Sequence, residues 1–198
     1  EMTRISPMTF RSTDVGVVLD MMIHDLDLLT MLLGHEPSEI YANAVSVISE
    51  AEDMCNARLV FPEGSDGLSC TANVTASRLA MKTERKLRII SEEAYVSADF
   101  VKRSVTLIRK TANESQLNDL RKRLADGEDL TSVDFIEVIE VEEPEIGSED
   151  ALTLQAKDFL HSIRSGSKPE VDAEAGSMAI RTAERIMQQA TAAGTGIV

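Results

Sequence analysis

The sequence lacks the short motifs that bind nucleotide phosphates or that mark common hydrolases. It contains no G-x-G-x-x-G and no G-x-x-x-x-G-K-[ST], so this chain by itself is not expected to bind a dinucleotide or a P-loop phosphate in the standard way. It has no H-E-x-x-H, and no serine or cysteine lies in a recognisable nucleophile elbow. These absences leave few segments that could carry chemistry.

Long apolar runs and cysteines are also scarce. The longest apolar stretch is interrupted by four ionisable residues, so we expect no transmembrane helix: Asp20, His24, Asp25 and Asp27. The first residues do not form a signal peptide, and residue 1 is not methionine, so we expect a fragment of a longer protein. The two cysteines, Cys55 and Cys70, are too few for a disulfide framework and lack metal-ligand spacing. We therefore expect buried, reduced thiols and a cytoplasmic protein.

Basic residues are in deficit. The chain has 20 Lys and Arg against 34 Asp and Glu, a formal net charge of −14. An acidic surface repels phosphate backbones and anionic headgroups, so no nucleic-acid or membrane partner is expected. Between Asp134 and Asp150 there are eight carboxylates and no basic residue. This segment is interpreted as a solvated strand edge and loop rather than a cation site.

The order of predicted elements indicates the fold class. The length of 198 residues suits one domain. Hydrophobic periodicity predicts helices over 17–33, 114–125, 149–164 (with Ser148 as N-cap) and 172–192. Strands are predicted over 1–11, 39–49, 54–61, 68–79, 85–90, 94–100, 104–109 and 134–141. The pattern predicts an α+β fold: a largely antiparallel open sheet with helices on one face.

The predicted strand 68–79 suggests what covers the other face of that sheet. One of its faces is apolar (Leu68, Cys70, Ala72, Val74 and Ala76), and the other carries uncharged polar residues (Ser69, Thr71, Asn73, Thr75 and Ser77). A merely solvated face usually carries Lys and Glu. The uncharged face therefore indicates a flat contact with another protein surface.

The predicted helix 17–33 carries the clearest candidate site. Asp20 and His24 lie one turn apart on one face, and Asp27 continues the stripe. Because the helix is apolar almost all round, we expect it to be buried, where a carboxylate and an imidazole are costly unless paired or used. Three interpretations remain open: a core histidine bonded to an aspartate, a metal pair at i and i+4, and a proton-transfer dyad.

Two segments resemble a known family. The run Asp20-Met21-Met22-Ile23-His24-Asp25-Leu26-Asp27, followed by Leu32-Leu33-Gly34, resembles the D-x-x-x-H-x-x-D helix of the glucose–fructose oxidoreductase, inositol dehydrogenase and rhizopine-catabolism (Gfo/Idh/MocA) family. The segment 159–169, followed by an Ala-rich helix and residues 194–198, resembles that family's closing F-x-x-x-I-x-x-G-x-x-P segment. One departure is the segment 91–94, where many relatives have a G-x-x-G turn and this chain has Ser-Glu-Glu-Ala.

The resemblance implies an incomplete enzyme. It implies that residues 1–198 form the C-terminal substrate-binding and oligomerisation domain, and that the N-terminal Rossmann domain is absent from this chain. The implied activity is oxidation of a hydroxyl of a sugar, polyol or nucleotide-sugar by hydride transfer to NAD or NADP, which the absent domain mainly binds. The implied assembly is a homodimer or tetramer through the open sheet face.

The resemblance also implies roles for individual residues. His24 takes the hydroxyl proton, Asp20 positions the hydroxyl or the imidazole, and a lysine of the absent domain completes the triad. Asp27 is a candidate substrate contact. Arg78, beside the uncharged face, is a candidate contact of the substrate or a partner, with pairing to a surface acid as the alternative interpretation. Two further hypotheses stay open: a non-catalytic binding or dimerisation domain, and a metal-dependent lyase or isomerase that uses Asp20 and His24 as ligands.

Overall fold

The structure is a computed structural model that describes residues 1–10, 13–64, 67, 69–129, 138–192 and 196–197. The chain forms two compact units, Glu1–Lys86 with Gly147–Val198, and Leu87–Ile146. Within the described ranges no helix is both long and apolar enough to cross a bilayer. The prediction that residues 1–198 form a C-terminal substrate-binding domain stays a prediction.

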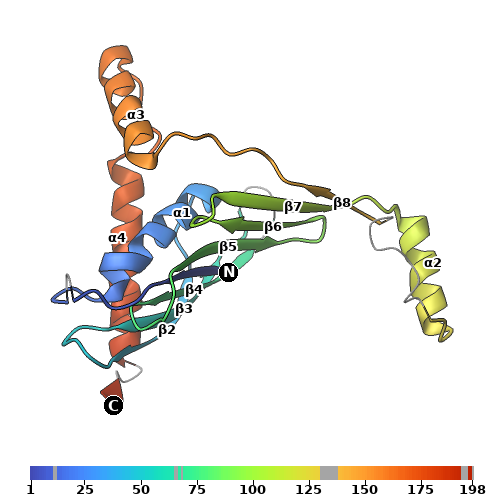
Figure 1. Ribbon diagram of the computed structural model, residues 1–198, viewed down its shortest axis with the longest axis horizontal. Helices are drawn as coiled ribbons and strands as arrows, with labels where there is room; N and C mark the ends of the chain where they lie inside the picture. Colours follow the sequence, from blue (N-terminus) through green and yellow to red (C-terminus); the bar gives the residue numbers. More distant parts are fainter. Residues whose placement is uncertain (11–12, 65–66, 68, 130–137, 193–195, 198) are drawn as a thin grey trace. The chain divides into compact units, whose positions relative to one another are not determined.

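The first unit is built on a mixed, mostly antiparallel sheet (Figure 1). Its strands are β1 (Met2–Ile5), β2 (Glu39–Ser46), β3 (Met54–Phe61), β4 (Cys70–Ser77) and β9 (Gly196–Ile197), in the order β1-β4-β3-β2-β9. β2, β3 and β4 pair antiparallel, while β1 pairs with β4 and β9 pairs with β2 in parallel. The strands predicted over 54–61 and 68–79 are confirmed as the antiparallel neighbours β3 and β4. The strand expected over 1–11 spans only Met2–Ile5, and the prediction does not include β9.

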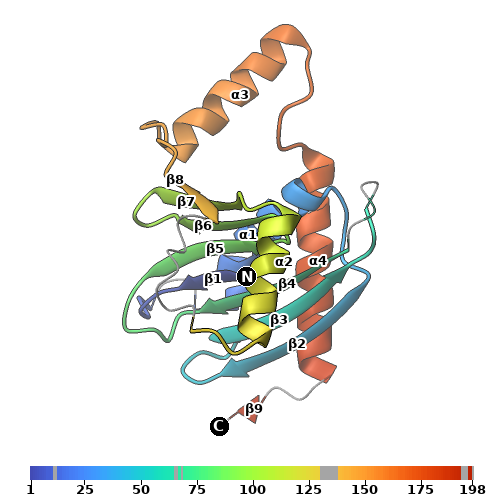
Figure 2. The ribbon, with the colours of Figure 1, turned by 90° about the vertical axis from the view of Figure 1, so that its right-hand side faces the viewer.

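Side chains alternate across this sheet as the sequence predicts. The residues of one face are buried: Ile40, Ala42, Cys55, Ala57, Leu59, Phe61, Ala72, Val74 and Ala76. Two helices, α1 (Ile23–Leu33) and α4 (Ala173–Ala192), cover this face (Figure 2). α4 contributes buried residues at helical spacing, namely Ala179, Ala183, Ile186 and Ala190. The α+β class, with helices on one face of the first unit's sheet, is therefore confirmed.

The helix expected over 17–33 differs from the prediction in two ways. Its first turn is the π-helix η1 (Val18–Met22), in which the N–H of Ile23 donates to the carbonyl of Val18, and α1 follows directly. Gly34 ends α1 in the left-handed conformation, with φ 76°, as expected. The segment is not buried all round, because Leu19, Met31 and Leu32 are 39%, 51% and 49% exposed.

A further helix of the first unit, α3 (Ala151–Ser165), begins later than expected. The predicted cap Ser148 is wrong, because the carboxylate of Asp150 accepts the N–H of Thr153 at 3.0 Å and caps the helix. Gly166 ends the helix with φ 71°. Four large apolar residues at helical spacing on α3 are exposed: Leu152, Phe159, Leu160 and Ile163.

The second unit contains β6 (Ala94–Asp99), β7 (Ser104–Lys110), β8 (Ile139–Glu142), the helix α2 (Glu114–Ala125) and most of β5 (Glu84–Ile90). The strand order is β5-β6-β7-β8, and the pairs β6–β7 and β7–β8 are antiparallel. A capping box between Asn113 and Gln116 begins α2 at the predicted position. Of the strand predicted over 134–141, residues 134–137 lie outside the described residues.

Candidate functional site

Asp20 and His24 lie on the surface of one continuous helical segment. Asp20 belongs to η1, His24 to the first turn of α1, and both side chains are exposed. In the described part of the chain, neither side chain takes part in a hydrogen bond or ion pair. The interpretation of His24 as a satisfied core histidine is therefore wrong. The expected burial of both groups is wrong as well, because η1 and α1 turn only part of their surface toward the sheet.

An exposed imidazole beside a carboxylate can exchange protons with a bound molecule. Histidine is the side chain whose ordinary titration lies near neutral pH, and a carboxylate one turn away can orient either the ring or a hydroxyl group. Two cavities described in the first unit, of about 450 Å³ and about 240 Å³, are not lined by either residue. Both side chains are exposed in this chain.

A buried ion pair fixes the helix directly behind His24. Arg4 of β1 donates from Nε to Oδ2 of Asp25 at 3.0 Å and from Nη2 to Oδ1 at 2.7 Å. Asp25 is only 4% exposed. Since successive helical residues point about 100° apart, an Asp25 held inward turns its neighbour His24 outward. No local pattern in the sequence indicates this pair, because its members are 21 residues apart.

Glu52 and Gly16 hold the start of η1. The backbone carbonyl of Glu52 accepts the N–H of Val17 at 3.0 Å, and its carboxylate Oε1 accepts the N–H of Val18 at 3.2 Å. A Cβ on Gly16 would lie 2.0 Å from the Glu52 carboxylate, so any other residue there would push the end of the Glu52 side chain aside. The Gly16 carbonyl in turn accepts the N–H of Asp20 at 3.0 Å. Residues in the loop between β2 and β3 therefore anchor the turn that carries Asp20.

Asp53 organises the same loop from inside the protein. Its Oδ2 accepts the N–H groups of Val47, Ile48 and Ser49 at 2.9, 2.6 and 2.9 Å, and its Oδ1 accepts the hydroxyl of Ser49 at 2.6 Å. Burial by itself raises the pKa of this fully buried carboxyl, but the hydrogen bonds from Ser49 and the three amides outweigh it and lower the pKa to about 2. Asp53 is thus a fixed anion beneath the site.

Arg78 belongs to this support and not to the exposed polar face. It is 4% exposed, its Nε lies 3.8 Å from Oδ1 of Asp53, and its Nη2 donates to the carbonyl of Val15 at 2.5 Å. Its backbone N–H donates to the carbonyl of Asp53 at 3.0 Å. The alternative in which Arg78 pairs with an acid is the one observed, although that acid is buried rather than on the surface.

Asp27, the third residue of the predicted stripe, is half-buried. Its backbone carbonyl accepts the hydroxyl of the buried Thr30 at 2.9 Å, an interaction within α1. Among the described residues no polar contact restrains its carboxylate, so its role as a substrate contact stays a prediction.

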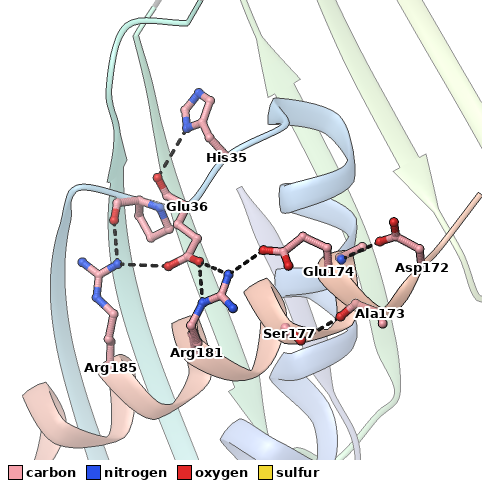
Figure 3. Close-up of polar contacts among 10 residues, drawn as sticks. His35, Glu36, Asp172, Ala173, Glu174, Ser177, Arg181 and Arg185 are labelled. Carbon is pink, nitrogen blue, oxygen red and sulfur yellow. Dashed lines mark hydrogen bonds and ion pairs between the residues drawn. The ribbon is translucent and has the colours of Figure 1, made fainter.

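An ionic cluster fixes the opposite end of α1 (Figure 3). Glu36, in the turn that follows α1, accepts from Nε of Arg181 at 2.7 Å, and Arg181 of α4 also reaches Glu174 at 3.1 Å. Arg185 of α4 donates to the carbonyls of Pro37 and Ser38 at 2.8 and 3.2 Å. The helical segment with Asp20 and His24 is therefore held at both ends and from below.

Metal-ligating side chains do not gather around Asp20 and His24. In the described ranges, no three His, Cys, Asp or Glu side chains come together in a way that could hold a metal ion. The pair thus has no third protein ligand among those residues, and a metal site there would need ligands from elsewhere.

Comparison with known proteins assigns the chain to a family. Residues 9–195 match the oxidoreductase family, C-terminal alpha/beta domain. A UDP-N-acetylglucosamine 3-dehydrogenase of Acidithiobacillus ferrooxidans is 28% identical over 94% of this chain and 52% of that protein. A myo-inositol 2-dehydrogenase of Thermotoga maritima is 22% identical over 88% of this chain and 46% of that protein. The chain thus spans about half the length of the curated relatives it matches.

Solved structures agree with this assignment. The UDP-N-acetylglucosamine 3-dehydrogenase GnnA of Acidithiobacillus ferrooxidans superposes with a TM-score of 0.77 and 27% identity, over 96% of this chain and 54% of that one. Levoglucosan dehydrogenase in complex with NADH and levoglucosan shares the fold, with a TM-score of 0.68 and 15% identity over 97% of this chain and 56% of that one. This chain therefore belongs to the Gfo/Idh/MocA oxidoreductase family and corresponds to its C-terminal alpha/beta domain.

Proposed function

We propose that this chain is the substrate-binding half of an NAD(P)-dependent dehydrogenase that oxidises a hydroxyl of a sugar, a polyol or a nucleotide-sugar. The observation that carries the proposal is the exposed pair of Asp20 and His24 on a firmly anchored helical segment. The family assignment supports it, since the similar curated proteins are dehydrogenases of UDP-N-acetylglucosamine and myo-inositol.

In this proposal His24 is the general base. Its exposed ring is accessible to a substrate hydroxyl group, and it has no partner within the described residues that competes for the proton. Asp20, one turn earlier, accepts a hydrogen bond from the substrate hydroxyl or from the imidazole and holds that group in line. Asp27 contributes a further acceptor on the same stripe, whereas Arg78 supports the turn from below.

The nicotinamide, when bound, supplies the acceptor for the hydride. This chain has no G-x-G-x-x-G to hold the dinucleotide. This chain instead offers an exposed acid–base pair, which fits the proton-transfer half of the reaction. We infer that the dinucleotide and a lysine come from a Rossmann domain outside this chain, and that docking of that domain excludes water from the pair.

A second copy of the chain is the proposed partner of the open sheet face. The exposed residues of this face in β2, β3 and β4 are mostly uncharged and polar: Glu39, Tyr41, Asn43, Asn56, Arg58, Thr71 and Asn73. Two pairs of opposed residues bond across the strands, Arg58 to Asn73 at 3.2 Å and Thr75 to Asn56 at 2.6 Å. Polar groups already satisfied within one chain make a flat face that loses little when a second copy covers it.

The experiment uses the full-length protein with its upstream domain. Reduction of NAD⁺ and NADP⁺ is followed with UDP-N-acetylglucosamine, myo-inositol and levoglucosan. His24→Gln should lower kcat on the accepted substrate by roughly 10²- to 10⁴-fold, with the KM for the dinucleotide unchanged. The matched control is His161→Gln, because His161 is also an exposed histidine and lies on α3.

Three outcomes are informative. Equal activity of His24→Gln and His161→Gln would overturn the role of His24. Substrate binding without turnover of any compound, in a protein that binds the dinucleotide, would favour a non-catalytic binding domain. Stoichiometric metal that is needed for turnover would favour the lyase or isomerase alternative.

Since both cysteines are free, the cytoplasm remains the proposed compartment.

A further inference from the structure

The side chain of Glu52 occupies the space that a residue other than glycine would fill at position 16. The ideal Cβ position of Gly16 lies 2.0 Å from both Cδ and Oε1 of Glu52. From this position the carboxylate accepts the N–H of Val18, whose side chain is fully buried. Glu52 therefore bonds a backbone group at the first residue of η1, two residues before Asp20.

Asp20 lies in the same π-helical turn as Val18, so the contact between Glu52 and Val18 affects the direction of the Asp20 side chain. A π turn contains more residues than an α turn, so its presence changes the angle between side chains that lie before and after it. Asp20 lies within η1 and His24 lies just beyond it. The first N–H groups of a helix have no partner within the helix, and Glu52 supplies an acceptor for one of them from the loop before β3. The direction of Asp20 relative to His24 thus depends on a residue that touches neither side chain.

We propose that Glu52 is a positioning residue for the site: its carboxylate fixes the π turn and thereby aims Asp20 at the hydroxyl group held by His24. The role of Glu52 rests on the proposed function, because it acts only through Asp20. Two observations support it, namely the bond that the carboxylate accepts from the N–H of Val18 and its close approach to Gly16. The bond from the N–H of Val17 goes to the backbone carbonyl of Glu52 and does not involve the carboxylate. The adjacent Asp53 accepts the N–H groups of Val47, Ile48 and Ser49 in the same loop. The Glu52 carboxylate is not needed for those contacts and binds η1.

A matched pair of substitutions separates positioning from space filling. Glu52→Gln keeps an acceptor oxygen at the same reach and should keep kcat within about threefold of the wild type. Glu52→Met keeps the length of the side chain and removes the acceptor. It should lower kcat about 10- to 100-fold, as small misplacements of reacting groups do, while the KM for the dinucleotide stays constant. Both variants are made in the full-length enzyme.

A double-mutant cycle with Asp20→Asn distinguishes positioning from a general loss of structure. If Glu52 acts through Asp20, the double variant Glu52→Met with Asp20→Asn should have a kcat less than about twofold below that of Asp20→Asn alone. If the double variant loses kcat by the full product of the two single-variant losses, Glu52 acts on the whole fold and the proposal is overturned. Equal kcat for Glu52→Met and the wild type overturns it as well.

The same cycle separates this role from the proposed function. If Asp20→Asn and His24→Gln themselves leave kcat unchanged, the proposed function fails and Glu52 has no site to position. Should Glu52→Met not fold, Gly16→Ala replaces it, because the new methyl group must displace the Glu52 carboxylate. Gly16→Ala should then lower kcat to the same degree and show the same non-additivity with Asp20→Asn; full additivity overturns the proposal.

Discussion

The guanidinium of Arg4 binds the carboxylate of Asp25 through two hydrogen bonds, directly after His24 in the sequence. The two side chains are 17% and 5% exposed, so the pair is largely removed from water. The inward carboxylate and the outward imidazole belong to consecutive residues of α1. The stability of the fold and the orientation of the proposed base therefore depend on the same short stretch of helix.

The first prediction concerns this ion pair. Arg4→Met should lower the free energy of unfolding by about 3 kcal/mol, because it leaves the Asp25 carboxylate buried without its cation. The double variant Arg4→Met with Asp25→Leu should recover most of the loss, since an apolar pair of similar size needs no desolvated charge. Urea unfolding of the full-length protein measures both.

An exposed ion pair provides the control for this prediction. Lys157 pairs with Glu149 near the start of α3, with side chains 59% and 48% exposed. Lys157→Ala should cost less than about 1 kcal/mol, because water and salt screen such pairs. If Arg4→Met lowered the free energy of unfolding as little as Lys157→Ala does, the buried pair would not be important for stability.

The second prediction concerns pH and Asp53. The folded-state pKa of about 2 lies below the ordinary value of 3.8, so the folded protein holds the proton less tightly than the unfolded chain. The stabilisation is therefore fully present above about pH 4 and is lost as the pH falls toward 2; its size is about 2 kcal/mol. The stability advantage of the wild type over Asp53→Asn should shrink across this window. Urea unfolding curves from pH 5 to pH 2 test this, and parallel pH profiles would contradict it.

The third prediction concerns the two thiols. Burial, with a smaller contribution from the nearby Glu52 carboxylate, raises the pKa of Cys55 to about 12, and its side chain is fully buried. Cys70 is half-buried at the start of β4. A thiol reagent at pH 8 should label Cys70 in the native protein and Cys55 only after unfolding, because the thiolate is the reactive form. Native labelling that persists in Cys70→Ser would contradict this order.

The fourth prediction concerns assembly through the open sheet face. Thr71→Glu places a carboxylate on the exposed side of β4 in a chain that already carries a net charge of −14. If two copies face each other there, association should weaken at least about tenfold, since like charges across an interface cost several kcal/mol. Sedimentation velocity of the full-length protein measures the change.

A charge added elsewhere provides the control for this fourth prediction. Ser115→Glu adds the same carboxylate to the exposed surface of the helix α2 and not to β4, and should leave association unchanged. Equal weakening by Thr71→Glu and Ser115→Glu would show that net charge, and not the sheet face, controls association.

Much of the local structure could be predicted from the sequence because its causes are local. The span Met54–Phe61 alternates as a half-buried strand, and Gly34 and Gly166 end their helices in the left-handed conformation that glycine adopts most readily. The sequence predicts the N-cap of α3 two residues too early, because Ser148 and Asp150 are both good caps by residue type. Only the hydrogen bond from Thr153 distinguishes them.

The support of the site could not be predicted, because its contacts join distant parts of the chain. Arg4 and Asp25 are 21 residues apart, and Arg78 reaches Val15 across 63 residues. The exposure of His24 was also missed, because the surrounding run is apolar on every side and its periodicity gives no direction. The π turn follows from no residue pattern in this segment, and the bond from Ile23 to Val18 defines it.

The residues that anchor the helical segment are not the residues that face solvent, and this matters for redesign. Arg4, Glu52, Asp53 and Arg78 lie behind or below the turn, whereas Asp20 and His24 face solvent. Libraries that vary exposed positions such as Leu19 and Met31 can thus test new substrate shapes at the proposed site without changing these anchors. Transplanting the segment into another protein, in contrast, would require moving the loop before β3 together with it.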